Sequence, residues 1–493
     1  MNKQLKHDEI DKIIKKLKKE KKKIVLVHGV FDLLHIGHIK YFKKAKSYGN
    51  ILIVSVTSND YVNKGPNRPY FDEKLRMEFI EQLDCVDYVT ISESENAKSI
   101  ISKVKPNFYI KGNDYEKVKK TDKNLQEEIK ATKGNGGKFL ILKEILFSSS
   151  KLINENLNNQ KKNHLKIIKS LKLKNLIEDI KNLKKKRVLI FGDQIIDQFT
   201  FVKSLGKSRK NNIISTRYIN KESQLGGSFF IYKNIKQYFK NADFLNLCSV
   251  NEKNNRYLPK DTKKIIVKND SLIYKNRYVD FYNLTKIFQE NKNDKIELNK
   301  LDNFKIIKYL KKIIKNYDAI VICDFGHGIF KGKILDFINK SKIFKIINCQ
   351  TNSSNFGFNK YTKYKNADVL TCDEDEFRLS LENENENIEK LLKNNSFPYK
   401  QFIVTSGKNG CYLKAGKTIK FVESFEIQNF VDSIGSGDVF FSYFTVLNYL
   451  KSYSTEEKLL LSHLSAAIHS QTFANREIVS EEKFYKSIKT LLS

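Results

Sequence analysis

The amino-acid sequence predicts an α/β protein with two doubly wound domains. Three observations lead to this prediction. Short apolar runs, of the kind that form strands buried on both faces, alternate with stretches of helical spacing, which is typical of a parallel sheet. This alternation begins at Ile24 and starts afresh at Arg187, after a polar stretch rich in lysine and asparagine. A chain of 493 residues is also long enough for two domains, each with its own core.

The first domain is predicted to span residues 1–154. Residues 1–23 are lysine-rich and amphipathic and predict a helix that leads into the first strand. Because ligands bind at the carboxyl ends of the strands in such sheets, we expect a site after the first strand. Strands are predicted at 24–27, 51–56, 86–91, 107–110 and 138–142, and helices at 37–48, 72–84 and 95–104.

A helical connector is predicted at residues 155–186, followed by the second domain at 187–493. Two segments of this domain, 212–232 and 263–283, look like extended excursions, and we expect them to form a small β lid over a site. The other predicted strands begin at Arg187 and lie at 319–323, 345–348, 368–371 and 402–405.

The composition limits the classes of protein to which the chain can belong. The net charge of +34 suggests a nucleic-acid partner, but the lysines are scattered and no basic stretch is interleaved with stacking aromatics, so we expect small anionic substrates instead. Six cysteines with no CxxC pair argue against a zinc knuckle or a disulfide framework and fit a reducing cytoplasm. We expect no membrane span and no signal peptide.

The first candidate site follows the first predicted strand. Residues 24–38 read IVLVHGVFDLLHIGH: an apolar strand, a His-Gly turn and then a helix. His35 and His38 are three residues apart, so on a helix they share a face, with Gly37 beside them. A helix N-terminus after a buried strand binds anions through its free N–H groups and its dipole. The stretch therefore predicts a site where a triphosphate approaches the backbone closely.

Four further segments of the first domain also favour phosphate binding. Each places cations, glycine or hydroxyl groups near the carboxyl end of a predicted strand. Each motif is weak alone, but together and in order they predict one phosphate-binding edge of the sheet. The candidate residues are Lys64, Arg68, Arg76, Lys111, Ser148, Ser149 and Ser150.

These motifs (GVFDLLHIGH, KGPNRP, EKLR, KGNDY and FSSSKLIN) resemble the cytidylyltransferase-like nucleotidyltransferases over about residues 22–154. The likeness is greatest to the adenylyltransferase half of the bifunctional heptose-phosphate enzymes of lipopolysaccharide-precursor synthesis. It implies a HIGH-type, Rossmann-like domain in which a sugar phosphate attacks the metal-bound α-phosphate of a nucleoside triphosphate and pyrophosphate leaves. It implies that His35 and His38 stabilise the charge that builds up on the α-phosphate and the leaving group. The resemblance assigns nucleotide or phosphate binding to Gly29, Phe31, Gly37, Lys64, Arg68, Arg76, Lys111, Ser148, Ser149 and Ser150.

The nucleotide of this domain is ATP or CTP. Relatives that use CTP carry an Arg-Thr pair shortly before the serine run, whereas Lys143 and Glu144 stand there in this chain. The ATP-using heptose relatives also lack that pair, so the difference favours ATP.

The second candidate site centres on the motif DSIGSGD at 432–438. Its alternating glycines predict a nest of backbone N–H groups at a helix start, and the carboxylate of Asp438 is placed to take a proton from a hydroxyl. A second glycine turn after a strand contains Thr405, Gly407 and Gly410. Asp373 and Glu376 belong to an acidic cluster whose oxygens suit Mg²⁺, although a solvated acidic loop explains them equally well.

The order GDQIID, GG, DFGHG, DEDE, TSGKNG and DSIGSGD resembles the ribokinase-like, PfkB-type carbohydrate kinases over about residues 187–493. The resemblance implies that Asp438 is the catalytic base for a sugar hydroxyl, and it implies a homodimer formed through the lid. It assigns the anion hole to Gly435, Ser436 and Gly437, ATP binding to Thr405, Gly407 and Gly410, sugar binding to Asp193, Asp197, Gly226, Gly227, Lys275 and Arg277, and Mg²⁺ to Asp373 and Glu376.

Departures from these families leave the sugar open. GGSFF stands where relatives have GGAAN, so Phe230 replaces an amide that often contacts sugar hydroxyls. Asn348-Cys349-Gln350 replaces the Asp-Pro-Lys of the heptose kinases, and Asp373 and Glu376 stand in place of an NxxE motif. The order of the two domains is the reverse of that in the heptose enzymes, where the kinase comes first.

The sequence therefore predicts a cytoplasmic, bifunctional enzyme of nucleotide-sugar synthesis that uses Mg²⁺. The second domain phosphorylates a heptose-like sugar or sugar phosphate from ATP, and the first transfers a nucleotidyl group from ATP or CTP to the sugar 1-phosphate. An alternative is an active transferase with a degenerate PfkB-like domain that senses a sugar or is structural. A third hypothesis, a basic nucleic-acid-binding protein, has only the charge in its favour.

Overall fold

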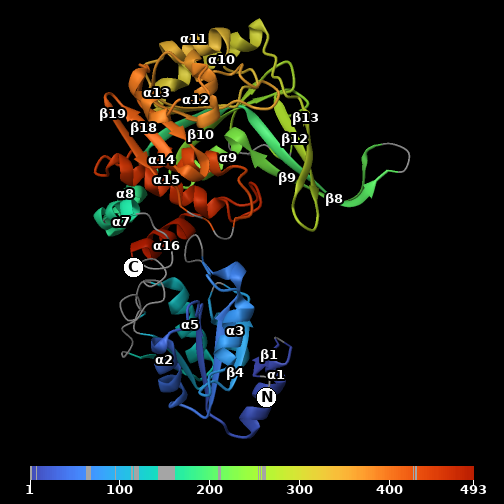
Figure 1. Cartoon of the computed structure of the whole chain (residues 1–493), viewed down its shortest axis with the longest axis vertical. Coiled ribbons are helices and arrows are strands. Elements are labelled where there is room, and N and C mark those ends of the chain that lie inside the picture. The colour runs from blue at the N-terminus through green and yellow to red at the C-terminus, as the bar shows by residue number, and fades with distance from the viewer. Residues whose placement is uncertain are drawn as a thin grey trace. The chain divides into compact units, whose positions relative to one another are not determined.

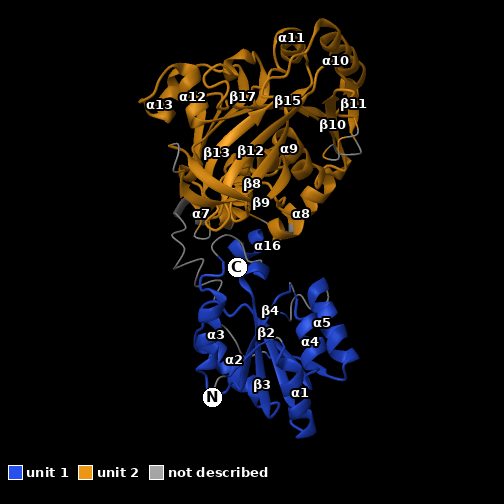
Figure 2. Cartoon of the chain, turned by 90° about the vertical axis from the view of Figure 1, so that its right-hand side faces the viewer, with its two compact units in different colours: residues 1–160, 486–493 blue, residues 161–485 orange. Residues whose placement is uncertain are grey.

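The protein divides into two compact units, residues 1–160 with 486–493 and residues 161–485 (Figures 1 and 2). The computed structural model describes residues 3–6, 8–62, 68–94, 96–112, 115, 122–142, 162–171, 173–208, 212–253, 255, 257, 262–425, 427 and 430–492. The domain boundaries expected from the sequence, at residues 154 and 186, stay a prediction.

The first unit is built on a parallel sheet with the strand order β1-β4-β3-β2-β5-β6. The order reverses between β2 and β5, which confirms the predicted doubly wound sheet and places its switch point at the carboxyl ends of these two strands. The strands are β1 Gln4–Leu5, β2 Ile24–Gly29, β3 Ile51–Thr57, β4 Tyr88–Ser92, β5 Phe108–Gly112 and β6 Lys138–Leu142.

Strand β2 is buried on both faces, as its continuous apolar run predicts. Val25 and Val27 belong to one apolar cluster with Phe42, whereas Ile24 and Leu26 belong to the cluster on the opposite face. Helices α2 and α3 contribute to the first cluster, and α1 and α4 to the second. Removing this apolar surface from water is the main force that holds the strand in place. The helices are α1 Ile10–Lys19, α2 Ile36–Lys46, α3 Glu73–Glu81, α4 Lys98–Val104 and α5 Lys123–Gly134.

Two elements of the first unit differ from the expectation. The predicted helix over residues 1–23 covers only Ile10–Lys19, because Gln4–Leu5 pairs with β4 as a short edge strand. Helix α5 was not predicted, since its buried face carries Glu128 and Thr132 beside Leu125 and therefore shows little apolar periodicity.

The second unit has a central sheet with the order β11-β10-β7-β14-β15-β16-β17-β18-β19. It is parallel from β11 to β17 and ends in two antiparallel strands, and its order reverses between β7 and β14. Its strands are β7 Arg187–Gly192, β10 Asn241–Cys248, β11 Lys263–Ile266, β14 Ala319–Asp324, β15 Phe344–Cys349, β16 Ala367–Asp373, β17 Tyr399–Thr405, β18 Cys411–Ala415 and β19 Thr418–Val422.

Helices cover both faces of this central sheet. Figure 1 shows α10 to α13 on one side and α9, α14 and α15 on the other. The helices are α9 Gly227–Lys236, α10 Lys300–Ile313, α11 Gly332–Lys340, α12 Glu374–Leu381, α13 Ile388–Asn394, α14 Ser436–Leu447 and α15 Thr455–His469. Helix α16 Glu481–Leu492 begins in the second unit, and its residues from Lys486 onward belong to the first. Short 3₁₀ helices occur in the protein at Asn59–Tyr61, Leu183–Lys185, Ile314–Asn316, Tyr361–Lys363 and Gly407–Asn409.

A separate sheet of the second unit, with the order β13-β12-β8-β9, forms the predicted lid. Strand β8 begins buried and ends exposed, and in Figure 1 it extends away from the central sheet with β9. The predicted excursions are only partly strands of this lid, since 263–266 forms β11 of the central sheet and Gly227 opens α9. The lid strands are β8 Gln194–Lys207, β9 Ile214–Gly226, β12 Leu272–Asp280 and β13 Lys286–Lys292.

The part of the predicted connector that the structure describes is helical. It forms α7 Lys162–Ser170 and α8 Leu173–Asn182, and both belong to the second unit. The six cysteines are free thiols. Within the described part of the chain, no helix has the length and apolar character that crossing a membrane requires.

Candidate active sites

The two histidines of the first site form the start of helix α2. His35 is the N-cap, where its Nδ1 accepts the N–H of Gly37 at 3.0 Å. His38 Nδ1 accepts the N–H of His35 at 3.4 Å, which completes a reciprocal capping box. Since both Nδ1 atoms accept backbone protons, the proton of each neutral ring lies on Nε2. Burial lowers the pKa of His35, so this ring is a neutral donor rather than a cation.

The turn before this helix is fixed by packing and by one buried carboxylate. Phe31 has a φ of 49°, and its ring centroid lies 5.0 Å from that of Phe42 and 5.9 Å from that of His38. Asp32 accepts the N–H groups of Tyr70 and Phe71 at 2.8 and 2.9 Å. The sequence therefore folds here into a rigid strand-to-helix turn whose amide groups stay at the carboxyl end of β2.

Arg68 lies beside this turn and retains bonding capacity. Its Nε donates to Asp32 Oδ2 at 2.9 Å, and both side chains are about 1% exposed. Its two Nη atoms are buried without a hydrogen-bond partner among the described residues. A buried guanidinium with unsatisfied N–H groups fits an anionic ligand, because each group left unpaired is costly.

Arg76, in contrast, donates four hydrogen bonds inside the protein. Its Nη1 donates to the carbonyls of Val30 and Thr57 at 2.6 and 2.9 Å. Its Nε donates to the Phe71 carbonyl at 2.9 Å, and its Nη2 donates to Asn59 Oδ1 at 2.7 Å. This geometry makes Arg76 a brace between the turn, β3 and α3, and its expected support of the phosphates would act through that brace.

Lys111, at the end of β5, is also bonded internally. Its Nζ lies 3.2 Å from Glu128 Oε2, with both side chains about 5% exposed or less, and 4.6 Å from the ring centroid of Tyr115. Burial disfavours the charged form of Lys111, but Tyr115 and Glu128 outweigh this effect and raise its pKa. Lys64, Ser148, Ser149 and Ser150, like Lys143 and Glu144, lie outside the described residues.

His28 is a residue of this site that sequence reasoning missed. It ends the apolar run of β2, and its ring nitrogens lie 3.1 Å from Ser55 Oγ and 3.4 Å from Thr57 Oγ1. Burial, together with the Lys111 charge, holds the pKa of His28 well below its usual value. The sequence feature that could have identified His28 is its position in the His-Gly turn at the switch point.

In the second unit, Asp438 occupies the first turn of α14 behind the predicted nest. Gly435 is the N-cap with a φ of 80°, and a Cβ there would lie 1.9 Å from Asn475 Oδ1, so only glycine fits. Burial and the nearby Asp197 raise the pKa of Asp438 to about 7. Gln350 Nε2 donates to Asp438 Oδ1 at 3.3 Å, which places a residue of the Asn-Cys-Gln departure against the predicted base.

Asp193 lies at the switch point, directly after β7. Its Oδ2 accepts the N–H groups of Phe325 and His327 at 2.8 and 3.2 Å, whereas its Oδ1 is buried without a partner among the described residues. Burial and the neighbouring Asp324 raise its pKa well above the usual value. Such a carboxyl suits a hydrogen bond to a sugar hydroxyl.

Asp197 is bonded to two partners. Arg277 Nη1 donates to its Oδ1 at 2.5 Å, and Asn475 Nδ2 donates to its Oδ2 at 3.2 Å. A Cβ at Gly226 would lie 2.0 Å from Asp197 Oδ2, so glycine is required for this approach. Gly227 follows as the first residue of α9.

Lys275 lies on β12 among the charged groups of this site. Burial lowers its pKa, and Asp197, Asp193 and Asp438 are close enough to oppose that effect electrostatically. It is therefore a partly desolvated ammonium directed toward the predicted sugar site from the lid.

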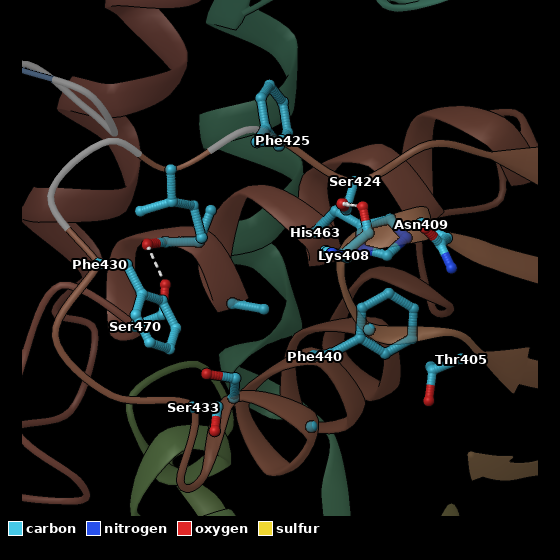
Figure 3. Close-up of a pocket in the computed structure, with 16 residues that line it drawn as sticks. Thr405, Lys408, Asn409, Ser424, Phe425, Phe430, Ser433, Phe440, His463 and Ser470 are labelled. Atoms are coloured by element: carbon cyan, nitrogen blue, oxygen red, sulfur yellow. Dashed lines mark hydrogen bonds between the residues drawn. The ribbon is translucent and has the colours of Figure 1, made fainter. Parts of the chain in front are cut away.

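A pocket of about 830 Å³ lies beside the nest (Figure 3). Four predicted residues line it, Thr405, Gly407, Ser436 and Gly437, whereas Gly410 and Gly435 shape the turns behind it. The apolar part of its wall suits a nucleobase and the hydroxyls suit a ribose. Sequence reasoning missed Lys408, Asn409, Ser424, Phe425, Ile427, Phe430, Ser433, Phe440, His463, Ala466, Ala467 and Ser470.

Asp373 and Glu376 form the capping box of α12. Asp373 Oδ1 accepts the N–H of Glu376 at 2.8 Å, and Glu376 accepts the N–H groups of Asp373 and Thr351 at 2.8 and 2.6 Å. Burial and Asp373 raise the pKa of Glu376 above its usual value. A buried carboxyl whose pKa is raised by a neighbouring carboxyl fits a divalent cation, but the described residues contain no group of three metal-ligating side chains. Water and phosphate oxygens would have to complete the shell, as is usual for Mg²⁺.

Two family models match different parts of the chain. The cytidylyltransferase-like family model matches residues 26–239, which extends beyond the first unit, and the pfkB carbohydrate kinase model matches residues 279–480. The fold and the sites thus define an α/β protein with two doubly wound units. The chain carries a cytidylyltransferase-like N-terminal domain and a C-terminal domain of the pfkB carbohydrate kinase family.

Curated relatives match over part of the chain. The "Bifunctional protein HldE" of Aliarcobacter butzleri is 36% identical over 133 residues, which are 27% of this chain and 28% of the relative. The protein of the same name from Geobacter metallireducens is 42% identical over 110 residues, 22% of either chain. The match thus spans less than a third of these relatives and fixes no position within them, so the reversed domain order stays a prediction.

Among solved structures, the ribokinase of Thermotoga maritima is 17% identical, with a TM-score of 0.47, and the match covers 62% of this chain and 99% of that one. The phosphofructokinase-2 of Escherichia coli is 14% identical, with a TM-score of 0.48, over 62% of this chain and 100% of that one.

Proposed function

We propose that the protein is a bifunctional enzyme of nucleotide-sugar synthesis. The second unit phosphorylates a heptose-like sugar or sugar phosphate from ATP, and the first unit transfers a nucleotidyl group from ATP or CTP to the sugar 1-phosphate. The observation that carries the proposal is the placement of a separate candidate site at the switch point of each parallel sheet. Joining consecutive steps in one chain raises the local concentration of the intermediate.

In the kinase half, Asp438 takes the proton of the sugar hydroxyl, and the resulting oxygen attacks the γ-phosphorus of ATP while ADP leaves. Its pKa near 7 leaves it partly deprotonated at neutral pH, which is the condition a general base needs. The N–H groups of residues 435–437 stabilise the transferring phosphoryl group. Asp193 orients the sugar, and Lys275 neutralises the phosphate of a phosphosugar.

In the transferase half, an oxygen of the sugar 1-phosphate attacks the α-phosphorus of the nucleotide, and pyrophosphate leaves. The Nε2–H groups of His35 and His38 donate to the oxygens on which charge builds up, and the buried Nη groups of Arg68 hold a phosphate. Neither histidine forms a covalent bond with the nucleotide.

Mg²⁺ is part of this proposal. In the kinase half, Asp373 and Glu376 would hold the ion, which neutralises charge on the nucleotide phosphates when bound. Asp373 pairs with Thr405 across β16 and β17, so its carboxyl lies at the same sheet edge as the nucleotide pocket. We place the enzyme in the cytoplasm, where its six thiols stay reduced.

The test supplies the full chain with Mg²⁺, ATP or CTP, and a panel of sugars, sugar 7-phosphates and sugar 1-phosphates. Mass spectrometry should detect a sugar bisphosphate or sugar phosphate with ADP, and separately an ADP-sugar or CDP-sugar with pyrophosphate. If no nucleotide sugar forms from any sugar 1-phosphate in the panel, the transferase proposal is wrong.

A second candidate function keeps the transferase and makes the PfkB-like half a sugar-sensing or structural domain. Phe230 favours it, because this buried ring packs 5.2 Å from that of His469 where relatives carry an amide. Consumption of ATP that depends on a sugar and is lost in Asp438→Asn would exclude this candidate.

A homodimer formed through the lid is also part of the proposal. The lid exposes large apolar side chains that a partner surface would cover, including Ile214 (62%), Tyr218 (63%) and Phe288 (55%). Light scattering should give twice the chain mass, and Ile214→Asp with Tyr218→Asp should give a monomer. A monomeric wild type at micromolar concentration would contradict it.

A further inference from the structure

Helix α7, which the sequence suggested was only a connector, packs against the wall of the nucleotide pocket. The Nε2–H of His164 donates to the carbonyl of Glu423 at 2.9 Å, and its ring centroid lies 4.9 Å from that of Phe425. His164 is only 2% exposed. A residue of the connector is therefore buried inside the second unit.

The segment that His164 contacts is part of the pocket itself. Ser424 and Phe425 both line the pocket, and Figure 3 shows them together with His463 on one wall. Ser424 Oγ also donates to the carbonyl of Lys408, in the turn that forms the neighbouring part of the wall (Figure 3). His164 thus holds a pocket segment from behind while Ser424 joins that segment to the turn in front.

The connector also forms hydrogen bonds to a second part of the pocket wall. Ser170, at the end of α7, donates its hydroxyl to Glu457 Oε1 at 2.8 Å, and Tyr453 donates to Asp179 Oδ2 of α8 at 3.2 Å. Glu457 lies in the first turn of α15, and this helix supplies His463, Ala466 and Ala467 to the pocket. Burial, and to a lesser extent the neighbouring His164, lower the pKa of His463.

We propose that His164 is a positioning residue for the kinase nucleotide, and that α7 docks more firmly when ATP or ADP fills the pocket. The inference rests on the proposed kinase function. Coupling of this kind is reciprocal: if docked α7 favours nucleotide binding, bound nucleotide favours docked α7 by the same factor.

The first test measures nucleotide binding to the full chain. In His164→Ala, the Kd for ADP and the KM for ATP should rise about tenfold, the loss expected for one buried hydrogen bond, while kcat stays within twofold. His164→Gln should recover most of the affinity, because its amide N–H can replace Nε2–H. The matched control is Lys166→Ala, an exposed position on the same helix, which should bind as the wild type does.

The second test separates coupling from a merely structural role. Hydrogen exchange of residues 162–170 should slow at least threefold when ADP is added to the wild type and should not respond to ADP in His164→Ala. ADP binding by His164→Ala within twofold of wild type, or exchange in 162–170 that ignores ADP in a wild type that binds it, would overturn the inference. A wild type that binds no ADP would overturn the proposed kinase, and this inference with it.

Discussion

In the first unit Arg76 and Lys111 are bonded within the protein, whereas in the second unit Asp193 and Asp438 keep capacity for a ligand. Arg76 donates to four internal acceptors and Lys111 pairs with Glu128. Asp193 retains an oxygen without a partner among the described residues, and Asp438 has a pKa near 7. The difference teaches that a charged residue in a motif can build the site or serve the substrate, and only its bonds distinguish the two.

The largest expected effect comes from Asp438→Asn. If this carboxyl serves the substrate, removing the base should lower the kinase kcat by about 10³-fold or more while ADP still binds. Pyrophosphate release by the transferase should stay within twofold. The measurement is sugar-dependent ADP release, with calorimetric ADP binding as the folding control. Loss of both activities together would end the proposed division of labour between the units.

The next effect is expected for His35→Asn, because His35 caps α2 and, in the proposed function, also serves the substrate. Asparagine is a good N-cap, so α2 keeps its cap while the imidazole is lost. Pyrophosphate release should fall by about 10²-fold, the scale of one lost transition-state donor, and the kinase should be spared. His35→Ala should lose the same activity and also destabilise α2 by about 1 kcal/mol. Full activity in His35→Asn would limit His35 to the cap.

Arg76→Met tests a residue that only builds the site. Four internal acceptors lose their donor, so we expect the first unit to lose about 3 kcal/mol of stability. Faster hydrogen exchange in β2 and β3 of the full chain would show it, with the exposed Lys74→Met as the control. Unchanged exchange together with a raised KM for the nucleotide would instead make Arg76 a phosphate ligand.

The smallest effect is a contrast in pH dependence. A general base works when deprotonated, so if Asp438 is the proposed base, the kinase kcat/KM should rise with pH and reach half of its plateau at about pH 7. Lys275 lowers the pKa of Asp438, so Lys275→Met should move the midpoint to higher pH. Burial keeps His35 neutral, so transferase activity should be flat above pH 6.5. A kinase profile that is flat between pH 6 and 8 would contradict the role of Asp438.

The sheets could be predicted from the sequence because their strands are short apolar runs. The apolar side chains of Ile24 to Val27 leave water only if the strand is buried on both faces, and the same holds for residues 319–323. Helix α5 was missed because its buried Glu128 pairs with Lys111 across the fold, an interaction that no local period reveals. Strand β1 was missed because two residues carry no pattern.

The glycine and acidic motifs of the candidate sites could be predicted, but the hydrogen bonds that each side chain makes could not. Arg68 and Arg76 look alike in the sequence, yet one keeps unbonded N–H groups and the other uses its N–H groups internally. The pocket residues Phe425 and Phe430 come from irregular segments without a period. His164 lies in a polar stretch whose partner, Glu423, is 259 residues away.

The side chains of β2 alternate between two apolar cores, and this alternation fixes where the first site lies along the sheet edge. Val25 and Val27 face one core and Ile24 and Leu26 the other, while β2 stays in register with β3 at every position from Ile24 to Gly29. A slip by one residue would exchange the two sets of side chains between cores of different shape. The same slip would move His28 and the turn along the sheet edge. Core packing therefore fixes the position of the site, because a strand register that shifted the turn would also put the core side chains on the wrong faces of the sheet.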